Sequence, residues 1–101
     1  PNARLRLMSA KELHTALDLL GSVAAPAASG IAVYARSALK ARTGLVLLRT
    51  MPQAAAAAAH ELFSVLRELD AHGVQLIWVE TPPDGPEWEG VRDRLQRAAA
   101  S

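Results

Sequence analysis

Polar side chains follow each of four apolar, strand-like runs in this 101-residue sequence. They are Ser9, Arg36, Ser37, Arg49, Thr50, Glu80 and Thr81. In open α/β sheets, ligands bind beyond the carboxyl ends of the strands, and arginines with hydroxyls near a helix amino terminus suit a phosphate. Strands also end in polar residues because they reach water there. We therefore treat Ser9, Arg36, Ser37, Arg49 and Glu80 as candidate ligand-binding residues, and favour the interpretation that they are solvated strand ends.

The sequence lacks the motifs that would give these candidates a specific chemistry. Neither G-x-G-x-x-G nor G-x-x-x-x-G-K-[ST] occurs, and no G-x-S-x-G elbow positions a serine nucleophile. A phosphoacceptor receiver domain has a similar order of elements, but it needs clustered acids at its strand ends. Met8-Ser9 and Arg36-Ser37 stand there instead. We predict no catalytic residue in this chain.

No metal site is predicted either. The three histidines, His14, His60 and His72, are widely spaced and form no H-x-x-x-H pair, and the sequence has no cysteine. We expect the histidines on solvated helix surfaces. Trp78 and Trp88 are expected to anchor the core rather than to form a ligand cage.

Composition bounds the class of protein. The length suits one domain, residues 1–101, and half of the residues are apolar, so a conventional core is expected. The formal charge of +1 gives no basic field for nucleic acid or an anionic membrane. No apolar run approaches the roughly 20 residues that cross a bilayer. The absence of cysteine is compatible with a reducing cytosol, so a cytoplasmic location is expected.

The amino-terminal third predicts a strand followed by a helix. Residues 4–8 alternate polar and apolar side chains, which is typical of an edge strand or a strand with one wet face. Ser9 and Glu12 have the spacing of a capping box, and leucines then recur at helical spacing up to Gly21. Residues 22–29 are predicted to form a loop.

Two apolar runs at residues 31–35 and 45–48 predict strands buried on both faces, as in parallel sheets covered by helices. A polar turn is predicted at 40–44 between them. This connection is too short for a crossover helix, so we expect either a hairpin or a tight loop to a non-adjacent strand. The sequence leaves these two alternatives open.

The remaining chain predicts helix, strand and helix. Alanines 54–59 begin a patterned segment that runs to Ala71, and Gly73 closes it, so a helix is favoured over a disordered linker. Residues 74–79 are the most strand-like segment, and a turn cluster follows at 81–86. Pro86 suits the first position of a last helix, whose apolar stripe is Trp88, Val91, Leu95 and Ala98. The fold class predicted is α/β: a three-layer Rossmann-like sandwich with a mostly parallel sheet of about four strands.

Several segments together resemble a known family. They are Leu66-Arg67-Glu68-Leu69-Asp70, Gly73, Ile77-Trp78-Val79-Glu80, Pro82-Pro83 and Asp93-Arg94-Leu95-Gln96-Arg97-Ala98-Ala99. This pattern is similar to the C-terminal domain of long-form threonylcarbamoyl-AMP synthases, whose catalytic part is a YrdC-type domain. In that family an H-Y-A-P segment precedes the first strand of this domain, and Pro1 matches its last residue. The start at Pro1 also favours a fragment of a longer chain.

The resemblance implies an indirect role. The full enzyme joins threonine, bicarbonate and ATP, with magnesium, into threonylcarbamoyl-AMP and pyrophosphate for the modification of tRNA. The family's substrate residues lie in the YrdC-type domain, so none is carried onto this chain. The resemblance implies that this domain packs on the catalytic domain and helps to close its active site. The alternative is an independent module that binds a small ligand or a nucleotide at its strand ends, and self-association is a third possibility.

Overall fold

The computed structural model describes residues 3–21, 30–39 and 46–100. Pro1, the predicted loop at 22–29 and the predicted turn at 40–44 lie outside these residues. The described strands form one four-stranded sheet in the order β1-β4-β2-β3. They are β1 (Arg4–Met8), β2 (Ile31–Ala35), β3 (Leu47–Thr50) and β4 (Leu76–Glu80). Every pair of neighbouring strands is parallel, so all carboxyl ends meet at one edge of the sheet.

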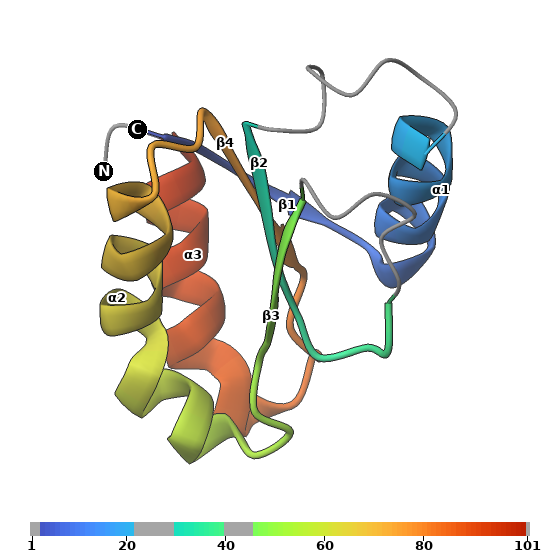
Figure 1. The fold of residues 1–101 in the computed structure, drawn as a ribbon. Helices are drawn as coiled ribbons and strands as arrows, with labels where there is room; N and C mark the ends of the chain where they lie inside the picture. Colours follow the sequence, from blue (N-terminus) through green and yellow to red (C-terminus); the bar gives the residue numbers. More distant parts are fainter. Residues whose placement is uncertain (1–2, 22–29, 40–45, 101) are drawn as a thin grey trace.

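Helices cover both faces of the sheet (Figure 1). Helix α1 (Ala10–Gly21) lies on one face, and α2 (Ala55–Ala71) and α3 (Glu89–Ala100) lie together on the other. The 3-10 turn η2 (Pro86–Trp88) leads directly into α3. The crossover through α1 runs from β1 towards β2, and the crossover through α2 runs back from β3 to β4. Right-handed crossovers in opposite directions place their helices on opposite faces, which produces the predicted three layers.

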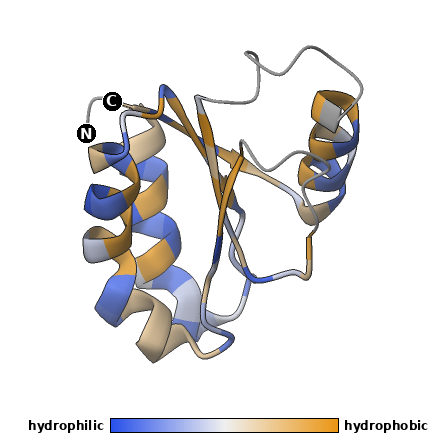
Figure 2. Cartoon of the chain, viewed as in Figure 1, coloured by the Kyte–Doolittle hydropathy of each residue, from blue (hydrophilic) through white to orange (hydrophobic). Residues whose placement is uncertain are grey.

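The core has two parts, one on each face of the sheet. The larger part lies under α2 and α3 and includes Tyr34, Leu62 and Leu95, and the smaller part lies under α1 and includes Val33, Leu13 and Leu17. Figure 2 shows the apolar faces of the helices turned towards the sheet. Strand β2 is buried at every residue, as its apolar run predicted, because it lies between β4 and β3 with helices on both sides.

The third strand differs from its prediction in position and in surroundings. It runs over residues 47–50 rather than 45–48, it lies at an edge, and exposure alternates along it. It is also the parallel neighbour of β2, so both the hairpin and the non-adjacent placement are wrong. Eleven residues, 36–46, separate the two strands. A five-residue strand is about 17 Å long, and about five extended residues cover that distance, so a connection of eleven residues is long enough to join two parallel neighbours.

The capping box, the helix-ending glycine and the proline before the last helix lie where the sequence predicted them. The amide of Glu12 donates to Oγ of Ser9 at 3.0 Å, and the amide of Ser9 donates to a Glu12 carboxylate oxygen at 2.8 Å, which completes the capping box of α1. Gly73 has a φ of 78°, a conformation that side chains with a Cβ disfavour, and it ends the turn after α2. The strand predicted at 74–79 runs over 76–80, and Pro86 opens η2 before the last helix.

Candidate functional site

Glu80 lies at the carboxyl end of β4, and its side chain is the centre of the candidate site. One carboxylate oxygen accepts from the amides of Arg36 and Ser37, at 2.9 and 2.8 Å. The other accepts from the Ser37 hydroxyl at 2.9 Å. Two adjacent backbone N–H groups and a hydroxyl are the donors that commonly hold a bound anion. We call these three donors the Glu80 cradle. The chain's own carboxylate fills it.

Arg36 is held beside this cradle by its own set of contacts. Its guanidinium carbon lies 4.9 Å from the centre of the Trp88 ring, within the range of a cation–π interaction. Nη2 of Arg36 donates to the side-chain oxygen of Gln53 at 2.9 Å, and the Gln53 amide donates back to the Arg36 carbonyl at 2.9 Å. Among the described residues, Nε of Arg36 is buried and has no hydrogen-bond partner.

The neighbouring strands β1 and β4 lead to helices on opposite faces of the sheet, α1 and α3. In such sheets a crevice opens there and receives the ligand. Here the amide of Thr81 donates to the carbonyl of Met8 at 2.8 Å, which continues the β1–β4 pairing beyond the strands. The Ser9 amide donates to the Glu12 carboxylate, and the Ser9 hydroxyl oxygen accepts from the Glu12 amide. Hydrogen bonding with Ser9 lowers the pKa of the Glu12 carboxyl. Ser9 and Thr81, the predicted residues at this crevice, therefore already form hydrogen bonds with other residues of the chain.

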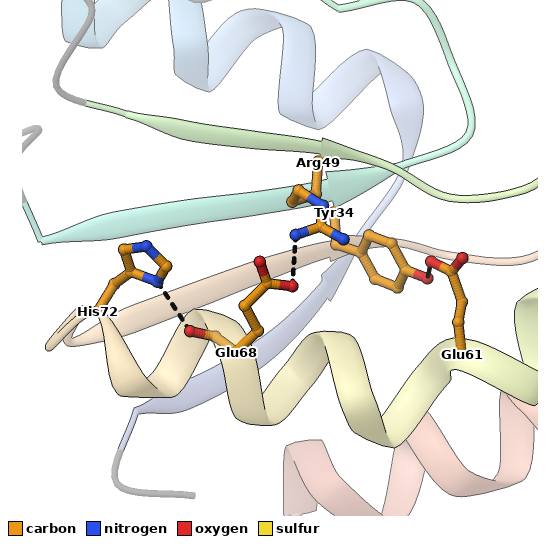
Figure 3. A network of polar contacts seen from close by, with 5 residues as sticks. All are labelled: Tyr34, Arg49, Glu61, Glu68 and His72. Atoms are coloured by element: carbon orange, nitrogen blue, oxygen red, sulfur yellow. Dashed lines mark hydrogen bonds and ion pairs between the residues drawn. The ribbon is translucent and has the colours of Figure 1, made fainter.

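Arg49 is placed differently from its prediction. It lies inside β3 rather than beyond it, and its side chain points to α2 rather than to the carboxyl edge (Figure 3). Nη1 of Arg49 donates to Glu68 on α2 at 2.5 Å, and this hydrogen bond raises the pKa of Arg49. Because the strand ends two residues later than the apolar run predicted, a residue expected at the edge becomes part of the sheet-to-helix packing.

The same layer holds two further polar contacts, which Figure 3 shows beside the ion pair. The Tyr34 hydroxyl donates to Glu61 at 2.5 Å, and burial of the Tyr34 ring raises the pKa of its phenol, with the hydrogen bond to Glu61 adding to the effect. Nδ1 of His72 lies 2.8 Å from the carbonyl oxygen of Glu68. The Tyr34 and Arg49 contacts join β2 and β3 to α2, and the His72 contact lies at the end of α2 itself.

A hollow of about 240 Å³ lies beside the ends of β2 and β3. The predicted residues Arg36, Ser37, Arg49 and Thr50 line it together with Leu39 and Leu48. Ser9 and Glu80 are not in its lining. Both arginines have partners elsewhere, Arg36 on Gln53 and Trp88 and Arg49 on Glu68. The structure thus brings three of the five candidates, Arg36, Ser37 and Arg49, to one hollow, with the two guanidinium groups directed to other side chains.

Sequence reasoning missed Gln53 and the role of Trp88 at this edge. Gln53 follows Pro52 before α2, and no pattern marks a single glutamine as a partner of Arg36. Trp88 was expected in the core, where it lies, and it also supports the Arg36 guanidinium.

Among residues 3–21, 30–39 and 46–100, no group of three or more His, Asp or Glu residues could hold a metal ion. In the same part of the chain, no helix is both long and apolar enough to span a membrane.

Comparisons with known proteins agree on one family and one fold. The family model described as "Threonylcarbamoyl-AMP synthase, C-terminal domain" matches residues 1–100. The crystal structure of P. abyssi Sua5 complexed with L-threonine is similar, with a TM-score of 0.72 and 19% sequence identity. The match covers 99% of this chain and 29% of that chain, so this chain spans less than a third of the length of its structural relative. No match was found among curated proteins.

Proposed function

This chain belongs to the family of threonylcarbamoyl-AMP synthase C-terminal domains, and from this we propose that it is a non-catalytic accessory domain of such an enzyme. In the proposal the whole enzyme joins threonine, bicarbonate and ATP into threonylcarbamoyl-AMP and pyrophosphate, for the modification of tRNA in the cytoplasm. This domain docks on the catalytic YrdC-type domain and helps to close its active site.

One observation carries the non-catalytic part of the proposal. The Glu80 cradle is an arrangement of anion-binding donors at the carboxyl edge, and an internal carboxylate occupies all three of them. A phosphate or carboxylate ligand would have to displace a covalently attached competitor at high effective concentration. The cradle therefore supports a structural role, in which Glu80 fixes the chain after β2.

Closing an active site is a physical task that a folded domain can perform without reactive groups of its own. Closure excludes water from a reactive intermediate and completes the arrangement of the catalytic groups. A mixed anhydride such as threonylcarbamoyl-AMP is susceptible to hydrolysis, so shielding it matters for yield. ATP and its magnesium are assigned in this proposal to the catalytic domain, because the described residues here offer no suitable cluster of oxygen ligands.

The test is removal of this domain from the full enzyme. We expect the truncated enzyme to lose turnover and to release more hydrolysed intermediate per pyrophosphate formed. The purified catalytic domain must first be shown to be folded, by circular dichroism and by threonine binding. Adding the 101-residue chain back in trans serves as the matched control. A folded catalytic domain with unchanged turnover and unchanged product yield would contradict the proposal.

A second candidate function rests on the hollow beside β2 and β3. It is about 240 Å³ in volume, and Nε of Arg36 is buried without a partner among the described residues. These features favour an independent module for a small anionic ligand. Titrating the chain with ATP, AMP and threonine while following amide chemical shifts distinguishes the two functions. Localised shifts at Arg36, Ser37 and Thr50 would support the binding module, and a flat response would support the docking role.

A further inference from the structure

Asp70 is an acidic residue in a place where a helix disfavours one. It is the second-last residue of α2, and the last turn of this helix carries no basic residue. The carbonyl end of a helix bears partial negative charge, so a carboxylate is unfavourable there. Asp70 also ends the segment Leu66-Arg67-Glu68-Leu69-Asp70, which is part of the family resemblance. The reason for an acid at this position therefore lies outside α2.

The Asp70 side chain holds the start of the sheet. Its Oδ1 accepts a hydrogen bond from the amide of Ala3 at 2.8 Å, across 67 residues of sequence. Ala3 directly precedes β1, and the amide of the next residue, Arg4, donates to the carbonyl of Gln75 at 2.9 Å. The Ala3 side chain is 6% exposed and packs in the part of the core under α2 and α3. The chain is thus held by its backbone and by a side chain before the strand begins.

The connection between α2 and β4 supplies both acceptors. The amide of Gly73 donates to the carbonyl of Asp70 at 3.1 Å, and Gly73 has the φ of 78° at which the chain turns towards β4. This turn places Asp70 and Gln75 beside the chain that enters β1 (Figure 1). We call the two hydrogen bonds, from Ala3 to Asp70 and from Arg4 to Gln75, the entry clamp.

The entry clamp secures a strand that has one neighbour. In the described sheet β1 lies at an edge and pairs only with β4, in a register that begins with Arg4 opposite Leu76. The ends of elements fray most easily, and an edge strand has fewer hydrogen bonds to prevent it. The bond from Ala3 to Asp70 fixes the chain one residue before the ladder begins. It therefore opposes fraying at the residue through which a preceding domain is joined.

We propose that Asp70 is a positioning residue, which fixes the direction in which the catalytic domain is attached to this domain. This role rests on the proposed docking function. The matching family model describes a C-terminal domain, so in the proposed enzyme the catalytic domain precedes this chain and is joined to it through Ala3. A connection held at its last residue permits a smaller range of angles than one that frays. The docking contact then forms with a smaller loss of orientational freedom.

Distances between two spin labels in the full enzyme test this role. The present chain has no cysteine, so Thr15→Cys on exposed α1 provides one label, and a single cysteine in the catalytic domain provides the other. Asp70→Ala is expected to at least double the width of the distance distribution and to lower turnover several-fold. Asp70→Asn keeps an oxygen acceptor and is expected to stay near wild type. A wild-type width in Asp70→Ala would overturn the inference and leave docking in place.

Tyr34→Phe is the matched control for a general loss of stability. It also removes one hydrogen bond to α2, that of Tyr34 to Glu61. The strand registers place Tyr34 in line with Leu7, four residues along the chain from Ala3. We expect both variants to lower the thermal midpoint by a few degrees, and only Asp70→Ala to widen the distance distribution. Equal widening in the two variants would show that the distances follow stability, which would overturn the inference.

Amide hydrogen exchange of the wild-type full enzyme tests the entry clamp without any variant. Protection that begins at Ala3, at the level of residues 4–8, supports the clamp. Exchange at Ala3 as fast as in the connection before it overturns the inference. Turnover separates this inference from the docking proposal. A widened distance distribution in Asp70→Ala with wild-type turnover would support the clamp and contradict the proposed docking function instead.

Discussion

At the scale of single residues, Glu80 joins the carboxyl ends of two neighbouring strands, β4 and β2. It accepts a hydrogen bond from Arg36, which lies 44 residues earlier in the sequence. Its carboxylate receives three hydrogen bonds from Arg36 and Ser37, and these bonds direct the chain as it leaves β2. Hydrogen bonds to an ionised acceptor are stronger than neutral ones, and a donor that loses its acceptor keeps its cost of desolvation. The side chain therefore contributes to stability as an acceptor rather than as a surface charge.

Replacing Glu80 tests this role. Glu80→Ala is expected to lower the free energy of unfolding by about 1–3 kcal/mol, because two partly buried amides lose their acceptor. Glu80→Gln keeps one oxygen in place and is expected to lose less. Urea unfolding followed by circular dichroism measures both, and Glu89→Gln on exposed α3 is the control. If Glu80→Ala were as stable as wild type, water would replace Glu80 as the hydrogen-bond acceptor of the cradle's donors, and the stabilising role of Glu80 would be contradicted.

Tyr34 is the one tyrosine of the chain, and its buried ring makes the chain sensitive to high pH. Burial raises the pKa of the Tyr34 phenol above its ordinary value of about 10, so the folded state favours the protonated form. Its contribution to stability is therefore complete below about pH 10. It is lost as the pH rises further, because the unfolded chain releases its proton first.

Tyr34→Phe isolates this effect. The variant loses the hydrogen bond to Glu61, about 0.5–1.5 kcal/mol at neutral pH, and it cannot ionise. We expect the free energy of unfolding to fall more steeply in wild type than in Tyr34→Phe between about pH 10 and pH 11. Tyrosinate absorbance gives an independent measurement, since it should appear only with unfolding. A reversible tyrosinate signal near pH 10 in the folded protein would contradict the raised pKa.

At the scale of elements, α1 begins with two reciprocal hydrogen bonds between Ser9 and Glu12. Ser9→Ala is expected to lower the free energy of unfolding by about 1 kcal/mol, and Ser9→Asp should retain most of the cap. Because the pKa of Glu12 is lowered, its contribution is present above its unfolded value and is lost as the pH falls through the folded one. Urea unfolding at neutral and acid pH measures both effects. Equal stability of Ser9→Ala and wild type would show that the cap is not needed.

The elements that the sequence predicts well are those fixed by neighbouring residues. Ser9 and Glu12 are three residues apart, Gly73 alone satisfies its backbone angle, and the helical stripes need only the helical period. The place of β3 depends instead on the ladder from Ala32 to Ala35, which pairs with residues 47–50. No local pattern encodes that register. The apolar run at 45–48 therefore predicted a strand, but not its bounds, its edge position or its neighbour.

In the candidate site too, the sequence predicts what neighbouring residues fix and does not predict what depends on strand pairing. The order of elements placed Ser9, Arg36, Ser37 and Glu80 at the carboxyl ends of parallel strands, where the structure has them. Which of them bond to one another depends on the strand order, because Glu80 reaches Arg36 and Ser37 only when β4 lies next to β2. The sequence left that order open. The closure of the Glu80 cradle could therefore not be foreseen from it.

At the scale of the whole molecule, one sheet separates two unequal parts of the core. Two helices cover one face and one helix covers the other, so the part under α1 buries fewer residues. The radius of gyration is 13.0 Å, which is the value of about 13 Å expected for a compact domain of 100 residues. Strand β2 contributes buried side chains to both parts, with Val33 on one face and Tyr34 on the other. Unfolding of either part thus removes packing from the other.

The two tryptophans make this coupling measurable. Trp88 lies in the part under α2 and α3, and Trp78 packs against the part under α1. Trp78→Phe and Trp88→Phe each leave one fluorescent reporter, on opposite faces of the sheet. We expect fluorescence and circular dichroism to give one urea midpoint within each variant, because a domain of this size unfolds cooperatively. If fluorescence of Trp78 in Trp88→Phe changed at lower urea than circular dichroism, α1 would be a separate, weaker unit. In the proposed docking, the domain would then offer its partner a stable face, that of α2 and α3, and a second face, that of α1, which unfolds first.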